Sequence, residues 1–242
     1  MKIIVCENYE ELSKKGAELI GAEVKKNPDA VLGLATGNSP IGIYRCLVEA
    51  YQKGELDFSR VQTYNLDEYL PIDPADKNSY CAFMHEHLWD KVNLKAEHCH
   101  IPAGNIAPEE APAVCAAYDK AIEAAGGIDL QLLGIGQNGH IGFNEPAETL
   151  LTGTHAVKLT DSTLKVNGQL FENPDDMPRH AVTMGLGAIF AAKKVLLIAN
   201  GKNKHAAIKG MLDDGVTTAL PASLLKLHPD LTVLCDKEAY HG

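Results

Sequence analysis

The sequence predicts an α/β fold built as one domain, with a mostly parallel, open, Rossmann-like sheet flanked by helices. Short apolar runs typical of buried strands alternate with amphipathic helical patterns along the whole chain, which is the pattern of strand–helix–strand units. No internal repeat and no linker-like stretch divides the sequence, and 242 residues are enough for a substantial core. We therefore expect a single domain over residues 1–242.

The first elements are set by apolar runs and helix-start signals. An apolar run at 3–5 predicts a strand, and Asn8 then suits the N-cap of an amphipathic helix. A second apolar run at 30–35 predicts a buried strand. In the loop after it, Ser39 suits an N-cap and Pro40 the first helical position, so we expect the next helix to begin there.

The rest of the chain continues the alternation, with one exception. Further strands are predicted at 61–65, 128–133, 194–199 and 231–235, and further helices at 79–89, 109–125 and beyond 204. The exception is the stretch 150–180, which is polar and rich in Gly and Pro. Such a long irregular stretch predicts a lid, or an excursion of the chain over the carboxyl edge of the sheet.

The loop at 134–146 carries the densest chemistry in the sequence. Four glycines let its backbone approach a ligand closely, and Asn138, His140, Asn144 and Glu145 place two amides, an imidazole and a carboxylate on the same turn. Acid–base groups of this kind directly after a buried strand predict an active site.

Two other interpretations of this loop exist. Gly134, Gly136 and Gly139 match the spacing of the dinucleotide-binding fingerprint, which requires a helix that opens at the third glycine. Gly142 and Pro146 interrupt any such helix within two turns, so the fingerprint is weak. A plain glycine-rich turn with surface polar residues is the other alternative.

Four loops that follow strands carry candidate functional groups. A Gly/Ser loop before a helix start is a natural anion site, two adjacent carboxylates could include a general base, and a Lys at a strand-to-helix turn could contact a phosphate. Each feature alone also fits a capped helix or a solvated side chain. Loops after parallel strands meet at one edge of the sheet, so we expect these four to lie together: 36–39, 67–68, 134–145 and 200–204.

Composition narrows the function classes. The net charge is -10 with a pI near 5.4, which argues against a general nucleic-acid binder and suits a soluble metabolic protein. No signal-peptide core and no apolar run long enough for a membrane span is visible, and the six cysteines form no CxxC pair. A cytoplasmic protein with reduced thiols and no membrane partner is expected.

Three motifs together resemble the glucosamine-6-phosphate deaminase family. They are LATGNSP at 34–40, YNLDEY at 64–69 and GQNGHIGFNEP at 136–146, and they stand in the family's order. The resemblance runs from the first predicted strand to about residue 236. The related 6-phosphogluconolactonases share the fold, but their second motif usually lacks the FNEP ending.

The resemblance implies conversion of glucosamine 6-phosphate and water to fructose 6-phosphate and ammonia, without a metal or an organic cofactor. Asp67 matches the family's base, which moves a proton from C2 towards C1. His140 matches the group that opens the sugar ring, helped by Glu145, and Asn138 stands where the family has Asp or Asn and can orient His140. The residues that match the phosphate site are Thr36, Gly37, Asn38, Ser39 and Lys204.

The chain departs from the family pattern at two places. An Arg of the family's phosphate site is replaced by Gln169, which predicts weaker phosphate binding or an altered substrate, and Arg179 is a candidate to compensate. The cations and serines of the allosteric members are also missing, with Glu148 and Val157 among the residues in their places. We therefore expect hyperbolic kinetics, no activation by N-acetylglucosamine 6-phosphate, and a monomer or small homo-oligomer.

These departures leave alternatives open. The chain could act on another hexosamine 6-phosphate, hydrolyse 6-phosphogluconolactone, or bind a sugar phosphate as a sensor without turnover. In every case the predicted partner is a small sugar phosphate.

Overall fold

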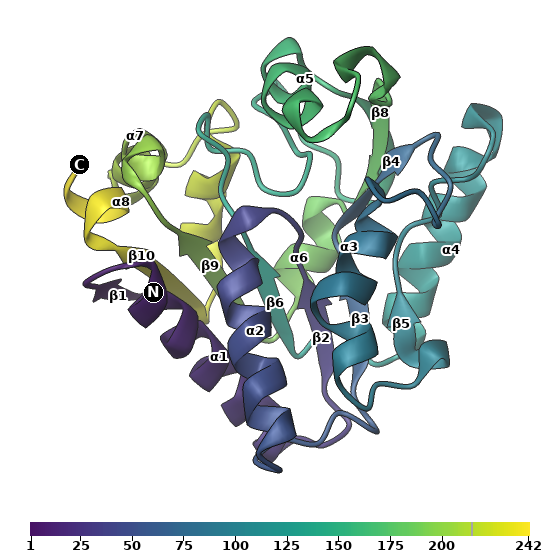
Figure 1. Ribbon diagram of the computed structural model, residues 1–242. Helices are drawn as coiled ribbons and strands as arrows, with labels where there is room; N and C mark the ends of the chain where they lie inside the picture. The colour runs from purple at the N-terminus through teal and green to yellow at the C-terminus, as the bar shows by residue number, and fades with distance from the viewer. Residues whose placement is uncertain (214) are drawn as a thin grey trace.

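A seven-stranded, fully parallel sheet forms the centre of the molecule, as the alternating pattern predicts (Figure 1). The computed structural model describes residues 1–213 and 215–242, without the side chains of 162, 166 and 170. Across the sheet the strands follow the order β1, β10, β9, β6, β2, β3, β5. Their bounds are β1 Lys2–Cys6, β2 Val31–Leu34, β3 Gln62–Asn65, β5 Cys99–His100, β6 Leu130–Leu133, β9 Val195–Ala199 and β10 Leu231–Asp236.

Helices cover both faces of this sheet. Gly16 of α1 lies against the Leu234 side chain of β10, and α1 packs along α2 on that face. Tyr64 of β3 points to the other face, where its hydroxyl donates to the carbonyl of Ala121 in α4 at 3.3 Å. The α-helices are α1 Tyr9–Lys26, α2 Asn38–Gln52, α3 Tyr80–His87, α4 Ala111–Ala124, α5 Asp161–Asn167, α6 Leu186–Ala191, α7 His205–Leu212 and α8 Lys237–His241.

The helix starts show one wrong prediction. Asn8 caps α1 as expected, because its side chain accepts from the N–H of Glu11 at 3.0 Å. Ser39 does not cap α2, which begins at Asn38, two residues before the predicted first position Pro40. Gly37 occupies the N-cap position with a φ of 95°, and no side chain caps this end. A conformation with positive φ suits glycine, so the turn is made by the backbone and the Ser39 hydroxyl is left for another partner.

A second, three-stranded antiparallel sheet lies above the carboxyl ends of the main sheet (Figure 1). Its order is β4 (Asp67–Leu70), β8 (His180–Thr183), β7 (His155–Lys158). The stretch 150–180 therefore holds a strand, the helix α5 and two 3₁₀ turns, η4 (Gly168–Leu170) and η5 (Pro174–Asp176), rather than an irregular loop. The sequence hides these strands because each has only four residues and carries exposed polar side chains.

The small sheet has an apolar core of its own. The buried side chains of this second cluster come from β4 and the loop after it, from the loop after β6, from the 150–180 stretch and from β8; they are Tyr69, Ile72, Phe143, Leu159, Phe171, Met177 and Ala181. Burial of several large side chains is the main driving force for holding a segment in place. The stretch is thereby fastened over the edge where the four predicted loops emerge.

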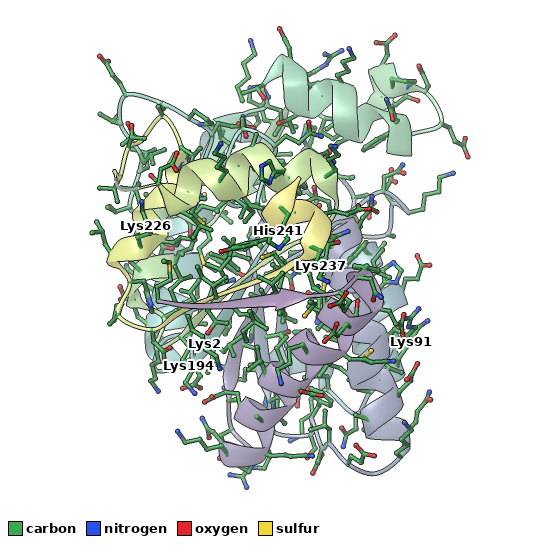
Figure 2. All side chains as sticks on the ribbon, turned by 90° about the vertical axis from the view of Figure 1, so that its left-hand side faces the viewer. Lys2, Lys91, Lys194, Lys226, Lys237 and His241 are labelled. Carbon is green, nitrogen blue, oxygen red and sulfur yellow. The ribbon has the colours of Figure 1, made fainter. Side chains whose placement is uncertain are left out.

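The strand β1 forms one edge of the seven-stranded sheet (Figure 2). Ile3 and Val5 are each 38% exposed there, and Lys2 and Lys237 flank the strand. Charged side chains at an open strand edge oppose pairing with other chains. None of the helices in the described part of the chain is long and apolar enough to cross a membrane.

Candidate active site

The loops after β2, β3, β6 and β9 open onto one cavity of about 290 Å³. This confirms the prediction that the four loops share a location. All but one of the nine predicted site residues line the cavity: Thr36, Gly37, Asn38, Ser39, Asp67, Asn138, His140 and Lys204. The ninth, Glu145, contacts His140 from behind. Tyr80, Phe143, Thr163 and Asn167 also line the wall, and the sequence analysis did not identify them as site residues.

One end of the cavity is built to receive an anion. The first turn of α2 faces it without a side-chain cap, so the free backbone N–H groups and the positive end of the helix dipole point at the ligand space. Lys204 lies at the same end, and burial lowers the pKa of its ammonium. No carboxylate in the described part of the chain forms an ion pair with Lys204. A half-buried cation without an ion-pair partner fits a site that binds a negatively charged ligand.

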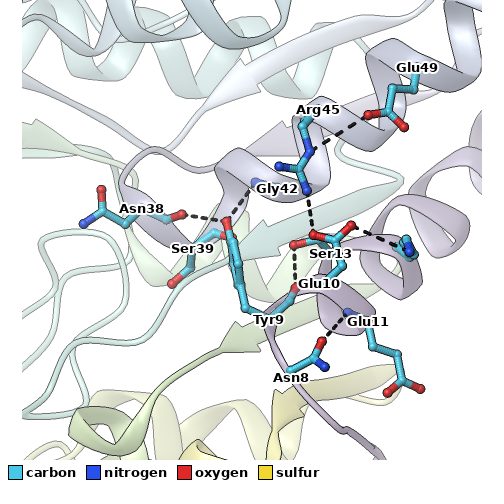
Figure 3. Close-up of polar contacts among 11 residues, drawn as sticks. Asn8, Tyr9, Glu10, Glu11, Ser13, Asn38, Ser39, Gly42, Arg45 and Glu49 are labelled. Carbon is cyan, nitrogen blue, oxygen red and sulfur yellow. Dashed lines mark hydrogen bonds and ion pairs between the residues drawn. The ribbon is translucent and has the colours of Figure 1, made fainter.

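This anion-binding end is braced from several sides. The Tyr9 hydroxyl of α1 lies between the carbonyls of Asn38 and Ser39, at 3.0 and 3.1 Å, and accepts from the N–H of Gly42 at 2.8 Å (Figure 3). The Ser39 hydroxyl donates to the Asn200 side chain at 2.6 Å, which links the loops after β2 and β9. These bonds hold the two loops of the anion end in a fixed relation.

Asp67 lines the same cavity. It begins β4, pairs with Thr183 of β8, and is 7% exposed. Within the described part of the chain, no hydrogen bond or ion pair is made by its carboxylate. Burial raises the pKa of Asp67 to about 8, and the charge of neighbouring Glu68 adds to this rise. A buried, unpaired carboxylate that faces a cavity is a stronger base than an ordinary, solvated aspartate.

Glu145 has the reverse surroundings. Its Oε2 accepts from Asn138 Nδ2 at 2.6 Å and lies 3.2 Å from His140 Nδ1, while its Oε1 accepts from the hydroxyl of Thr163 at 2.7 Å. Burial alone would raise the pKa of Glu145, but the bond to His140, the charge of His140 and the bonds from Thr163 and Asn138 outweigh it and lower the pKa to about 2. Glu145 is thus held as a carboxylate that can orient the His140 imidazole and stabilise its charged form.

Asn138 contacts both members of the His140–Glu145 pair. Its side-chain oxygen accepts from the backbone N–H of His140 at 3.2 Å, and its amide nitrogen donates to Glu145 Oε2 at 2.6 Å. These contacts agree with the predicted role of Asn138 in orienting His140, through the backbone and through Glu145 and without contact with the ring.

Two glycines of the central loop leave room for the reacting groups. A Cβ at Gly136 would lie 2.4 to 2.5 Å from three atoms of the His140 ring, so the ring packs flat on this glycine. Gly142 has a φ of 57°, and a Cβ there would lie 2.9 Å from Thr183 Oγ1 and 3.4 Å from Asp67 Oδ2. The glycines therefore set how closely the loop approaches His140 and Asp67.

The stretch 150–180 contributes polar groups that the sequence analysis missed. Thr163 of α5 binds Glu145, and Asn167 donates to the hydroxyl of Tyr69 at 3.0 Å. The Tyr69 hydroxyl in turn accepts from Tyr80 at 3.1 Å. The available signal was the Thr-x-x-Thr spacing at 160–163, which is a helix-start pattern, since Thr160 caps α5.

Other predictions for this region can now be judged. No helix opens at Gly139, so the loop lacks the element that a dinucleotide site requires. The Asn144 side chain is buried and donates to the carbonyl of Met184 at 2.9 Å, which ties the loop to the end of β8. Gln169 is exposed, and Arg179 is exposed beside Asp175 at 3.8 Å; neither lines the cavity.

A family model described as glucosamine-6-phosphate isomerases/6-phosphogluconolactonase matches residues 7–234. The chain belongs to this family. It is 51% identical to a glucosamine-6-phosphate deaminase of Thermoanaerobacter pseudethanolicus over 99% of this chain and 94% of the relative. It is 48% identical to a glucosamine-6-phosphate deaminase of Halothermothrix orenii over 99% of this chain and 98% of the relative.

Solved structures agree with this membership. The fold of a monomeric glucosamine-6-phosphate deaminase superposes with a TM-score of 0.95 at 42% identity, covering 99% of this chain and 98% of that one. A 6-phosphogluconolactonase from Trypanosoma brucei superposes with a TM-score of 0.77 at 18% identity, covering 98% and 97% of the two chains. The second likeness is one of fold alone.

Proposed function

We propose that the chain deaminates glucosamine 6-phosphate to fructose 6-phosphate and ammonia, with Asp67 as the base and His140 with Glu145 as the ring-opening pair. Relatives with 46–51% identity over nearly the whole chain carry this activity. The observation that carries the residue roles is that one cavity holds an unpaired carboxylate, a carboxylate–imidazole pair and an anion-binding end.

The anion-binding end takes the 6-phosphate. A phosphate there accepts from the free N–H groups of the first turn of α2 and pairs with the Lys204 ammonium. Binding the phosphate at one end fixes the sugar lengthwise, so that C1 and C2 reach the opposite wall. Such positioning lowers the barrier because the reacting groups no longer have to find each other.

His140 and Glu145 then open the pyranose ring. The imidazole takes the proton of the anomeric hydroxyl and returns a proton to the ring oxygen as the C1–O5 bond breaks. Glu145 holds the Nδ1 side of the ring at 3.2 Å and balances the positive charge that appears on His140. Asn138 and Thr163 keep the carboxylate in place during this step.

Asp67 carries out the aldose–ketose shift on the open chain. It takes the proton from C2 while the C1 oxygen gains a proton from solvent, which gives an enolamine. It then gives the proton back at C1 while the nitrogen releases a proton to solvent, which gives the C2 imine of fructose 6-phosphate. Water then adds to the imine carbon, the C–N bond breaks, and ammonia leaves with the ketose. A positioned base of this kind typically contributes about 10²–10⁴-fold to the rate.

The test is ammonia release with glucosamine, galactosamine and mannosamine 6-phosphates, with 6-phosphogluconolactone hydrolysis measured in parallel. We expect release to be fastest with glucosamine 6-phosphate and to vanish in Asp67→Asn. Faster release from another hexosamine phosphate would move the assignment to that sugar. Lactone hydrolysis without ammonia release would favour the lactonase alternative, and tight binding of all sugars without turnover would favour the sensor.

We also propose a monomer or small homo-oligomer without activation by N-acetylglucosamine 6-phosphate. A monomeric relative supports this proposal. In this chain Val157 of β7 pairs with Ala181 of β8, and Glu148 is an acid, so the two side chains offer neither a cation nor a donor to a second phosphate. The cytoplasmic location remains a prediction from the sequence.

A further inference from the structure

We propose that Glu68 is a positioning residue for the proton-transfer step, because it fastens the Tyr80 end of α3 beside the cavity and keeps a second negative charge next to Asp67. This inference rests on the proposed role of Asp67 as the base. Glu68 is a buried carboxylate beside the cavity that takes no part in the proposed proton transfers.

Glu68 is a buried carboxylate that is held by backbone groups alone. It is 2% exposed, and no Lys, Arg or His in the described part of the chain pairs with it. Its three hydrogen-bond donors are all backbone groups: Oε1 accepts from the N–H of Tyr69 and Tyr80 and Oε2 from the N–H of Cys81, each at 2.9 Å. Both oxygens are thus used as acceptors, which is the arrangement of an ionised carboxylate.

Two of these donors are the first N–H groups of α3. Ser79 caps the same end, since its hydroxyl accepts from the N–H of Ala82 at 2.9 Å. Glu68 and Ser79 therefore share the unpaired donors at the start of this helix, and the negative charge of Glu68 lies at the positive end of the helix dipole. Tyr80, the first residue of α3, lines the cavity and stacks parallel to Phe143 at 6.2 Å.

Glu68 follows Asp67 directly on β4, so the fastening and the charge both act on the wall that holds the base. Burial raises the pKa of Glu68, and its three N–H donors oppose this rise. A charged Glu68 makes ionised Asp67 less favourable, so Asp67 binds a proton more strongly. A stronger base takes the C2 proton more readily, provided that it is still deprotonated at the working pH.

Glu68 is the group whose charge raises the pKa of Asp67. The charge of Asp67 in turn contributes to the raised pKa of four tyrosines from three helices and a strand, namely Tyr44, Tyr69, Tyr80 and Tyr118. Burial raises the pKa of each tyrosine, to about 12 for Tyr69, so all four stay neutral. His140 and Lys204 are the other titratable groups that line the cavity.

The experiment compares the pH profiles of kcat/KM for the parent, Glu68→Gln and Ser79→Ala. Glu68→Gln removes the negative charge and one acceptor. Ser79→Ala loosens the same end of α3 and leaves the charge of Glu68 in place. We expect the acid limb of Glu68→Gln to move down by about one pH unit, the usual size of an environmental pKa shift. In Ser79→Ala we expect a raised KM with the limb unchanged. The substrate amine titrates equally in all three proteins and cancels in the comparison.

An acid limb that stays in place in Glu68→Gln would overturn the proposal, as would an equal movement in Ser79→Ala. If Glu68→Gln does not fold, Glu68→Asp carries the test, because it keeps the charge but shortens the reach to α3. Its limb should stay while its KM rises, and a limb that moves down would contradict us. Asp67→Asn separates the two proposals: if it remains active, the base assignment itself fails.

Discussion

The two walls of the cavity hold carboxylates in opposite states. The described residues donate no hydrogen bond to the Asp67 carboxylate, and burial raises its pKa to about 8. Asn138, Thr160 and Thr163 donate to the Glu145 carboxylate and His140 lies beside it, and the pKa falls to about 2. The same functional group thus serves as a base on one wall and as a permanent anion on the other, because the surroundings set which protonation state is stable.

The strongest way to break this comparison is Asp67→Asn. The amide keeps the shape but cannot accept the C2 proton, so deamination should fall by at least about 10²–10⁴-fold. Binding of the sugar phosphate should change little, because Asp67 is not part of the anion-binding end, which is formed by the start of α2 and Lys204. Ammonia release and equilibrium binding of fructose 6-phosphate check the two halves of the prediction. Near-normal turnover would refute the base role.

His140→Gln tests the other wall. Ring opening should be lost, so turnover of the cyclic substrate should fall by about 10²-fold or more. Exchange of the C2 proton on the open-chain fraction should persist, because Asp67 is untouched. Deuterium incorporation in heavy water, followed beside ammonia release, distinguishes the steps. Equal losses in both readouts would place His140 in a later step.

A smaller effect is expected when Glu145 loses one of its donors. Thr163→Val keeps the shape of the side chain but removes the hydroxyl that binds Oε1 at 2.7 Å. A hydrogen bond to a charged group is worth about 1.5–3 kcal/mol, so kcat should drop by roughly tenfold to a hundredfold. Thr163→Ser restores the hydroxyl and should recover most of the activity. If Ser fails to rescue, the loss reflects packing of α5 and not the bond to Glu145.

The smallest effect concerns the phosphate. Gln169→Arg restores the cation that the family carries at this position, and we expect KM to fall by about tenfold, which corresponds to about 1.4 kcal/mol. Gln169→Lys is the matched control, because it supplies the charge without the fork that binds two phosphate oxygens. An unchanged KM in Gln169→Arg would mean that position 169 stays away from the phosphate when the substrate is bound.

The two walls also differ in how far the sequence predicted them. The parallel sheet, its order of alternating elements and the meeting of four loops followed from apolar periodicity and from the edge rule for parallel strands. The motifs supplied Asp67 and the His140–Glu145 pair, whose placement in one site the structure bears out while their catalytic roles remain proposals. Local sequence patterns are enough to predict the site residues that directly follow strands.

The rest depends on contacts between distant segments. In the small sheet, β4 pairs with β8 across more than 100 positions of sequence, from Leu70 with His180 to Asp67 with Thr183, and its strands are too short and polar to stand out. Glu68 looked like one of two adjacent solvated carboxylates, yet β8 pairs with its strand and α3 closes over it. No local pattern shows that Thr163 reaches Glu145, since 18 residues separate them.

The most direct test of the two-wall account measures the free energy of unfolding against pH for the parent, Asp67→Asn and Glu145→Gln. The folded parent keeps the Asp67 proton up to about pH 8, whereas the unfolded chain releases it near 3.8, so the parent loses stability as the pH rises through this window. The Asp67→Asn side chain does not titrate, so the free energy of unfolding of this variant should increasingly exceed that of the parent between about pH 4 and 8.

Glu145 behaves in the opposite sense. Its lowered pKa stabilises the fold above the ordinary value of 4.5, and this contribution is lost as the pH falls towards about 2. Glu145→Gln should therefore be less stable than the parent at neutral pH, with a deficit that shrinks in acid. At pH 7 to 8 we predict that Asp67→Asn is more stable than the parent and that Glu145→Gln is less stable. Two variants that shift in the same direction, or differences that do not depend on pH, would contradict the account.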